Sequence, residues 1–415
     1  MRGAERDDTR RAAPPAGLRR LLITADAVGG VWPYTLHLAS ALRRRGVEIT
    51  IAVMGPPPSE RQRAVAAQVA TLACHGCRLE WMDDPWDDVE AAGKWLLDLE
   101  GSVRPDVVHL NGYCHASLPW RAPVLAVAHS CVCSWWRAVY GAEPPALFDR
   151  YRQEVSRGLI GARLVVAPTA AMLAALRREH GPIAEARVIP NGAPGLGMLA
   201  TTRPAHGEVP KEPFVLAAGR LWDHAKNIQS LCDVAASVSW PVYVAGSDTD
   251  PDGRRAPAGY VRHLGHLDPV EMTGWFERAA IYALPARYEP FGLSVLDAAA
   301  AGCALVLGDI PSLRENWSGA AVFVPPDNRR ALAGALRRLI EDDEERTRLG
   351  ALARSRAARF DLDRMAEAYL AAYREVTRRN TVRQASSSPS ALRRAAPTAS
   401  TSHCRIPETR MTIPV

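Results

Sequence analysis

The sequence predicts an α/β fold in which two Rossmann-like domains face a cleft. Short apolar runs alternate with helical stretches along most of the 415 residues, and the alternation restarts after a segment rich in Gly and Pro at 193–211. Strands that alternate with helices form parallel sheets covered on both faces. A chain of this length also favours two or more domains of roughly 100–200 residues each.

We expect the chain to divide into five parts. The two ends, residues 1–17 and 380–415, are poor in apolar residues, and this composition is typical of disorder. The remaining parts are a first domain at 18–200, a second domain at 201–360 and a terminal helix at 361–379 with an apolar stripe.

The first half opens with a strand at 21–24, a turn at Gly29 and Gly30, and a helix that ends near Arg45. A complete G-x-G-x-x-G is absent and the next strand, at 48–53, ends without an acid for a ribose, which argues against dinucleotide binding. The other elements expected here are helices at 62–73, 88–100 and 170–180, strands at 78–82, 105–110, 124–129 and 164–167, and a loop carrying Trp135 and Trp136.

The second half repeats the pattern. Expected strands lie at 214–218, 242–245, 260–263, 279–284, 304–307 and 321–324, and expected helices at 227–238, 269–278, 293–301, 328–341 and 344–358.

Composition limits the class of partner and the compartment. The net charge of +6 is mildly basic but spread along the chain, so we expect no nucleic-acid partner, while peripheral contact with an anionic membrane stays open. No apolar run is long enough to span a bilayer, and residues 1–20 lack the apolar stretch of a secretory signal. We therefore expect a cytoplasmic protein.

Two cysteine pairs raise the question of a zinc site. Cys74 and Cys77 are separated by two residues, and Cys131 and Cys133 by one. Four thiolates could close a zinc site, but both pairs lie in or beside apolar runs without the turns of a zinc knuckle. We interpret them as buried structural thiols, so no metal site and no cofactor is expected.

The stretch at 287–297 is the strongest candidate for a binding site. An apolar strand ends just before it and an alanine-rich helix starts within it, so the turn lies where α/β sheets bind ligands. The free N–H groups of a helix N-terminus suit phosphate, and Gly292 allows close approach of the backbone. Glu289 and Asp297 flank this turn and could contact different parts of one extended ligand.

This stretch resembles the Glu-x7-Glu signature of retaining glycosyltransferases with the GT-B fold, specifically glycosyltransferase family 4. Asp297 departs from the pattern, because the family usually has the longer Glu there. The resemblance covers roughly residues 18–379. It is supported by three further motifs: Pro190-Asn191-Gly192, Gly219-Arg220 with Lys226-Asn227, and Ala301-Gly302-Cys303.

The resemblance implies a terminal helix that crosses back to the first domain, an acceptor side in that domain and a donor side in the second. We expect Glu289 to bind hydroxyls of the transferred sugar and Asp297 to bind the ribose. His129, at a strand end, is implied to contact the sugar or the acceptor. The residues expected at the donor diphosphate are Gly29, Gly30, Arg220, Lys226, Phe291, Gly292, Leu293 and Ser294.

We therefore predict a metal-independent hexosyltransferase. It uses a nucleotide-diphosphate sugar and a glycan, lipid or small-molecule acceptor, and the resemblance implies retention of anomeric configuration. In place of a metal, Arg220 and Lys226 would stabilise the negative charge on the leaving diphosphate. Two alternatives stay open: an epimerase or hydrolase of nucleotide sugars on the same fold, and a non-catalytic sugar-nucleotide binder.

Overall fold

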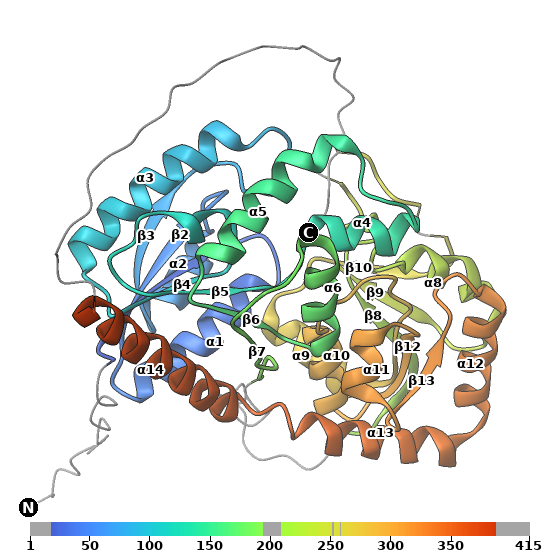
Figure 1. The fold of residues 1–415 in the computed structure, drawn as a ribbon. Coiled ribbons are helices and arrows are strands. Elements are labelled where there is room, and N and C mark those ends of the chain that lie inside the picture. Colours follow the sequence, from blue (N-terminus) through green and yellow to red (C-terminus); the bar gives the residue numbers. More distant parts are fainter. Residues whose placement is uncertain (1–17, 194–208, 251–252, 258, 387–415) are drawn as a thin grey trace, which may run out of the picture.

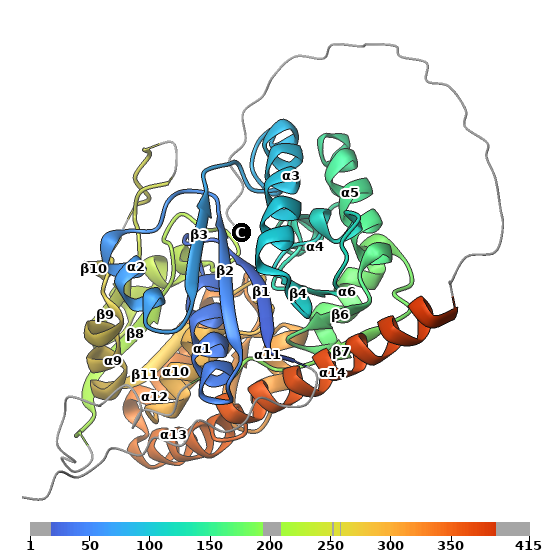
Figure 2. The ribbon, with the colours of Figure 1, turned by 90° about the vertical axis from the view of Figure 1, so that its left-hand side faces the viewer.

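The computed structural model describes residues 18–193, 209–250, 253–257 and 259–386. Within them the chain forms two parallel sheets, each flanked by helices, as predicted for two Rossmann-like domains (Figures 1 and 2). The predicted N-terminal segment at 1–17, most of the linker at 193–211 and the tail beyond 386 lie outside the described residues.

The first sheet has the strand order β3-β2-β1-β4-β5-β6-β7, and every pairing within it is parallel. Leu21 and Ile23 of β1 face one core, with α1 and α14, whereas Leu22 faces the opposite core, with α3. The strands are β1 (Arg20–Ala25), β2 (Glu48–Met54), β3 (Thr71–His75), β4 (Val107–Leu110), β5 (Val124–Val127), β6 (Leu164–Ala167) and β7 (Ala186–Val188). The helices are α1 (Val31–Arg44), α2 (Glu60–Ala67), α3 (Trp86–Val103), α4 (Val132–Tyr140), α5 (Asp149–Gly161) and α6 (Ala170–His180).

The second sheet has the order β10-β9-β8-β11-β12-β13 and is also parallel. Its central strand β11 is buried at every residue, which fits its almost continuous apolar sequence. The strands are β8 (Glu212–Ala218), β9 (Val242–Ala245), β10 (Arg262–Gly265), β11 (Ala279–Leu284), β12 (Ala304–Gly308) and β13 (Ala321–Val324). The helices are α8 (Ile228–Val234), α9 (Pro269–Arg278), α10 (Leu293–Ala300), α11 (Pro311–Trp317), α12 (Arg329–Glu341) and α13 (Asp343–Ala357).

The last helix, α14 (Leu362–Ser386), leaves the second domain and packs on the first (Figure 2). Its apolar stripe is buried in one core with α1 and β1, and it includes Met365, Tyr369, Leu370 and Tyr373. At the edge of this contact, the Arg45 guanidinium donates to the Glu367 carboxylate at 2.8 Å. The predicted crossover is present, and the helix continues past residue 379, where we expected it to end.

Several element predictions were wrong. Residues 78–82 do not form a strand. The third strand along the chain is β3, and its first residues lie within 62–73, where we expected a helix. The residues around Trp135 and Trp136, which we expected to form a loop, form helix α4. The Trp135 side chain is buried in a hydrophobic core of the first domain. Helices α5 and α11 were not predicted.

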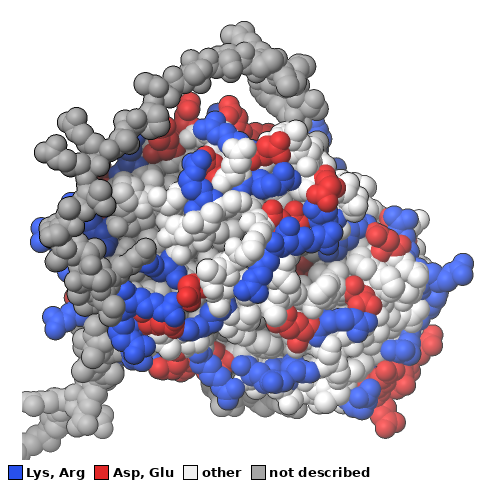
Figure 3. All heavy atoms as spheres, in the orientation of Figure 1, with Lys and Arg blue, Asp and Glu red and all other residues white. Residues whose placement is uncertain are grey.

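No helix in the described part of the chain combines the length and apolar character needed to cross a lipid bilayer. On the face shown in Figure 3, basic and acidic side chains are interspersed.

Replacing Leu370 in the apolar stripe of α14 tests how much this helix contributes to the stability of the first domain. Leu370→Ala should lower the free energy of unfolding of the first domain by about 2–5 kcal/mol, because Leu370 is 2% exposed and its neighbours cannot close the cavity. Urea unfolding followed by circular dichroism measures this loss. Leu352→Ala on α13, where the side chain is 38% exposed, is the control and should cost less than about 0.5 kcal/mol. Equal effects of the two substitutions would contradict a packed α14.

Candidate active site

Two helix N-termini, one from each domain, meet at the gap between the sheets. Gly30 precedes α1 and Gly292 precedes α10, and no described side chain caps either helix. A Cβ added at Gly30 would lie 3.6 Å from the Leu293 Cδ1 atom, so the two helix starts are close neighbours. Neither first turn contains an acid. Both helices therefore direct the positive ends of their dipoles towards this gap.

Gly292 is required at the start of α10. Its φ of +90° is strained for any residue with a Cβ, and an added Cβ would lie 3.0 Å from Val295 Cγ2. Ser294, in the first turn, accepts a hydrogen bond from the buried Tyr282 hydroxyl at 2.8 Å, so its own hydroxyl hydrogen is left to donate elsewhere. The Phe291 side chain instead packs against Phe360 in the core of the second domain.

The two predicted cations extend from the loop between β8 and α8. The Arg220 guanidinium donates to Asp223 at 2.8 Å, and the Lys226 ammonium contacts the Glu289 carboxylate at 2.5 Å. Each cation is 26% exposed, whereas the Asp223 and Glu289 side chains are 2% and 11% exposed. The acids thus hold the cations in place from the buried side, and each cation retains further N–H groups that can donate to a ligand.

Asn227 fixes the end of this loop. Its backbone is left-handed, with φ of 56°, and its amide nitrogen donates to the carbonyls of Pro285 and Pro326 at 2.8 Å each. Because Pro285 directly follows β11, these bonds hold the loop with the two cations against the loop that carries Glu289.

Asp26 is a partly buried acid of the first domain. It follows β1, and its carboxylate accepts from the backbone N–H of Val28 at 2.9 Å. Burial raises the pKa of Asp26, and backbone hydrogen bonds, first among them that of Val28, partly offset this rise, with the positive charge of Arg220 as the smallest contribution.

His129 lies at the end of β5 within a buried hydrogen-bond network. Its Nε2 atom is 2.9 Å from Asn111 Oδ1, and His109 Nε2 is 3.0 Å from the same oxygen. The amide nitrogen of Asn111 donates to the Thr24 carbonyl at 2.6 Å, so the amide oxygen is the acceptor for both rings. His109 Nδ1 then accepts from the Tyr373 hydroxyl of α14 at 2.6 Å.

Both histidines are neutral at physiological pH. Burial lowers the pKa of His129 to about 3, and burial likewise lowers the pKa of His109 to about 3. A neutral His129 that donates through Nε2 presents a lone pair at Nδ1. Within the described residues that nitrogen has no hydrogen-bond partner, so it can accept a bond from a ligand hydroxyl.

Asp297 is a half-buried carboxylate without a hydrogen bond or ion pair among the described residues. It lies on α10, and burial raises its pKa to about 7. An acid that is desolvated without a partner is costly to keep ionised, and such acids cluster at functional sites.

Tyr288 connects the second domain to the first. Its hydroxyl accepts from the backbone N–H of Cys131 at 3.1 Å and lies 2.9 Å from Ser134 Oγ, both at the start of α4. Thr169 adds a second connection, since its hydroxyl donates to the Pro290 carbonyl at 2.9 Å. The turn that carries Glu289 is therefore anchored to both domains.

Two family models match the chain, one in each domain. The model described as Glycosyltransferase Family 4 matches residues 28–194, and the model described as Glycosyl transferases group 1 matches residues 212–342. The chain belongs to glycosyltransferase family 4. The resemblance on which the sequence prediction rests is thus confirmed, and this member of family 4 is a glycosyltransferase.

Curated relatives include glycosyltransferases, and solved structures share the fold. The chain is 27% identical over 393 residues to glycogen synthase from Mycobacterium tuberculosis, covering 84% of this chain and 92% of the relative. It is 27% identical over 409 residues to D-inositol 3-phosphate glycosyltransferase from Xylanimonas cellulosilytica, covering 87% and 94%. Sucrose-phosphate synthase from Thermosynechococcus elongatus has a similar fold, with a TM-score of 0.68, 18% identity and coverage of 87% and 100%. Anabaena HepE in complex with UDP and glucose gives a TM-score of 0.67, 14% identity and coverage of 86% and 100%.

The structure places several of the residues predicted for the site next to one another. Gly30, Gly292 and Leu293 lie close together, and Lys226 contacts Glu289. Phe291 points into the core, so only its backbone is available to a ligand. Asn111, Asp26 and Tyr288 were missed, although two of them are polar residues directly after buried strands, a signal that the sequence contains.

The raised pKa of Asp297 predicts a pH-dependent cost to stability. Between pH 4 and 7 the folded protein binds more protons at Asp297 than the unfolded chain, so stability falls as pH rises through this window. Asp297→Asn should match the wild type near pH 4 and exceed it at pH 8 by on the order of 2 kcal/mol, less than the full shift because the side chain is partly solvated. Thermal unfolding at both pH values measures the difference. Glu344→Gln, at an exposed acid of α13, is the control, and a pH-independent effect of Asp297→Asn would contradict the prediction.

Proposed function

We propose that this protein transfers a hexosyl group from a nucleotide-diphosphate sugar to an acceptor hydroxyl, with retention and without a metal ion. The observation that carries the proposal is the gap at which two uncapped helix N-termini meet beside Arg220 and Lys226. Such an arrangement suits a ligand with two adjacent phosphates. The similarity in fold to a protein solved with UDP and glucose supports the same type of donor.

On the donor side, we assign the diphosphate to the N–H groups at the starts of α1 and α10, the Ser294 hydroxyl and the two cations. The Glu289 carboxylate would accept hydrogen bonds from hydroxyls of the transferred sugar, and it already lies beside Lys226. Asp297 would bind the ribose. Hydroxyl donors would supply the partners that its half-buried carboxylate lacks within the described residues.

On the acceptor side, we assign the first domain, with a boundary near residue 200. A cavity of about 50 Å³ lies at the carboxyl ends of β1, β2 and β4 and is lined by Asp26, Arg78, Glu80 and Asn111, among others. His129 is hydrogen-bonded to Asn111, which lines this cavity. The free Nδ1 atom of His129 would accept a hydrogen bond from a sugar or acceptor hydroxyl. A glycan, a lipid head group and a small polyol all present such hydroxyls.

In the proposed reaction, the bond between the anomeric carbon and the diphosphate breaks and the diphosphate leaves with the electron pair. The acceptor oxygen forms the new bond from the same face, and its proton passes to a phosphate oxygen of the leaving group. The helix dipoles, Arg220 and Lys226 would stabilise the charge that grows on the diphosphate, and they need little rearrangement because their buried acids already orient them.

Product analysis tests the reaction class. Incubation with UDP-, GDP- and ADP-sugars and candidate acceptors should yield a glycosylated acceptor whose anomeric configuration equals that of the donor. Free or epimerised sugar as the sole product, or an unchanged donor for every pair, would contradict the proposed transfer.

Replacing a cation should weaken binding of the diphosphate. Arg220→Ala should reduce the affinity for the nucleoside diphosphate by ~2–5 kcal/mol if the guanidinium is desolvated by the ligand. Lys226→Ala should do the same and also leaves Glu289 without its partner. Isothermal titration calorimetry with UDP, GDP and ADP measures the effect. Arg337→Ala, at an exposed arginine of α12, is the matched control, and an affinity equal to that of the control would remove the cation from the donor site.

Removing divalent cations should leave the chemistry intact. A metal at the diphosphate would supply several kcal/mol, so its loss would lower the rate by a factor of roughly 100 or more. We expect enzyme treated with EDTA and desalted to retain its transfer rate, measured as product formed per minute. A rate that falls and is restored by Mg²⁺ or Mn²⁺ would contradict the proposal.

A further inference from the structure

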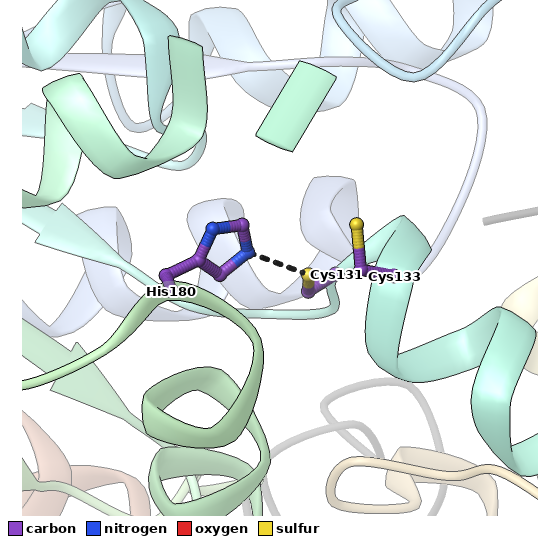
Figure 4. Close-up of side chains that lie close together, drawn as sticks. All are labelled: Cys131, Cys133 and His180. Atoms are coloured by element: carbon purple, nitrogen blue, oxygen red, sulfur yellow. Dashed lines mark hydrogen bonds between the residues drawn. The ribbon is translucent and has the colours of Figure 1, made fainter. Parts of the chain in front are cut away.

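Three side chains of the first domain that the proposed transfer does not use form a cluster of soft ligands. Cys131 and Cys133 lie at the start of α4, and His180 is the last residue of α6 (Figure 4). The two sulfur atoms and a ring nitrogen all lie within 4.8 Å of one another, and Cys131 Sγ is 3.2 Å from His180 Nε2. This is the one group of three or more candidate metal ligands among the described residues.

The His180 ring is oriented as a metal ligand requires. Its Nδ1 atom lies 3.0 Å from Ser156 Oγ, and the Ser156 hydroxyl donates to the Arg152 carbonyl at 2.7 Å. Because that hydrogen is already used, Ser156 accepts from Nδ1–H, and Nε2 presents its lone pair to Cys131. Metal-bound histidines are held in this way by a second residue that fixes the tautomer.

The two thiols are both fully buried. The N-terminus of α4 adds a positive dipole end beside the sulfurs.

We propose that Cys131, Cys133 and His180 bind one Zn²⁺ ion, with water as the fourth ligand. Two sulfurs and one imidazole nitrogen are ligands that Zn²⁺ prefers over Mg²⁺ or Mn²⁺. Bond lengths of about 2.3 Å to sulfur and 2.0–2.1 Å to nitrogen place tetrahedral ligands roughly 3.5–3.8 Å apart, so small side-chain shifts suffice. With both thiols deprotonated the ion and its ligands are neutral overall, which suits a buried site.

The ion would hold together the segment that links the active site to the second domain. It would join the start of α4 to the end of α6, just after His129. The backbone N–H of Cys131 donates to the Tyr288 hydroxyl of the second domain. The Zn²⁺ would thus fix the strand end that carries His129 and the docking point of Tyr288, without touching the donor.

Cobalt spectroscopy of the full-length protein tests the site. Reduced, metal-free protein titrated with Co²⁺ should bind one ion here, with thiolate-to-cobalt charge-transfer absorption in the near ultraviolet and tetrahedral d–d bands in the visible. Added Zn²⁺ should abolish both sets of bands. The absence of charge-transfer bands in the wild type would overturn the proposal.

Variants locate the ion. Cys133→Ser and His180→Gln should each weaken Co²⁺ binding by at least roughly 10-fold, the lower limit for loss of a group that only supports a ligand. The double variant Cys74→Ser with Cys77→Ser removes the other cysteine pair and should keep the spectrum of the wild type. Should Cys133→Ser fail to fold, as judged by circular dichroism, His180→Gln at the half-buried position decides alone. Unchanged binding by a folded His180→Gln variant would overturn the assignment.

This readout is independent of the proposed transfer reaction, because cobalt spectra need no donor. If EDTA lowers the transfer rate, the cation that restores it separates the two proposals. Restoration by Zn²⁺ alone supports the thiolate site, whereas restoration by Mg²⁺ or Mn²⁺, which prefer oxygen ligands, contradicts metal-free catalysis.

Discussion

The structure depends on bringing positive charge from two domains to one gap and keeping it there. Two helix N-termini, Arg220 and Lys226 would repel one another if nothing opposed them. Two acids oppose this repulsion from the buried side, since Asp223 pairs with Arg220 and Glu289 pairs with Lys226. A diphosphate would therefore meet cations whose side chains are already in position.

Apolar packing away from the candidate site helps to hold the two domains together. Helix α14 buries its stripe in the core of the first domain, so the chain that leaves the second domain is attached to the first by apolar burial. The same helix supplies Tyr373, which bonds to His109, and His109 shares the oxygen of Asn111 with His129. The residue that orients the neutral His129 is thus linked by two hydrogen bonds to the helix that joins the domains.

The parts of the site that could be predicted are local in sequence. A strand end, a glycine and a helix start follow one another around Gly292. The turn and its flanking acids, Glu289 and Asp297, could therefore be predicted from the sequence. The position of Asn111 directly after a buried strand was also a signal, but its hydrogen bonds to Thr24, His109 and His129 could not be predicted because they form only where β1, β4 and β5 lie side by side. Edge strand β3 was missed because pairing with β2 makes it a strand. Helix α4 was missed as well, although Gly141, a left-handed residue at its C-terminal end, is a helix-stop signal in the sequence.

Tyr288 and Glu289 are consecutive residues, yet their side chains bond to opposite lobes. The Tyr288 hydroxyl is held by the first domain, and the Glu289 carboxylate by Lys226 of the second. A rotation of one lobe against the other would break or shift one of these two bonds, as well as the hydrogen bond from Thr169 to Pro290. The angle between the lobes and the position of the Glu289 carboxylate are therefore coupled, and under the proposed assignment of Glu289 to the transferred sugar, opening of the lobes would displace that contact.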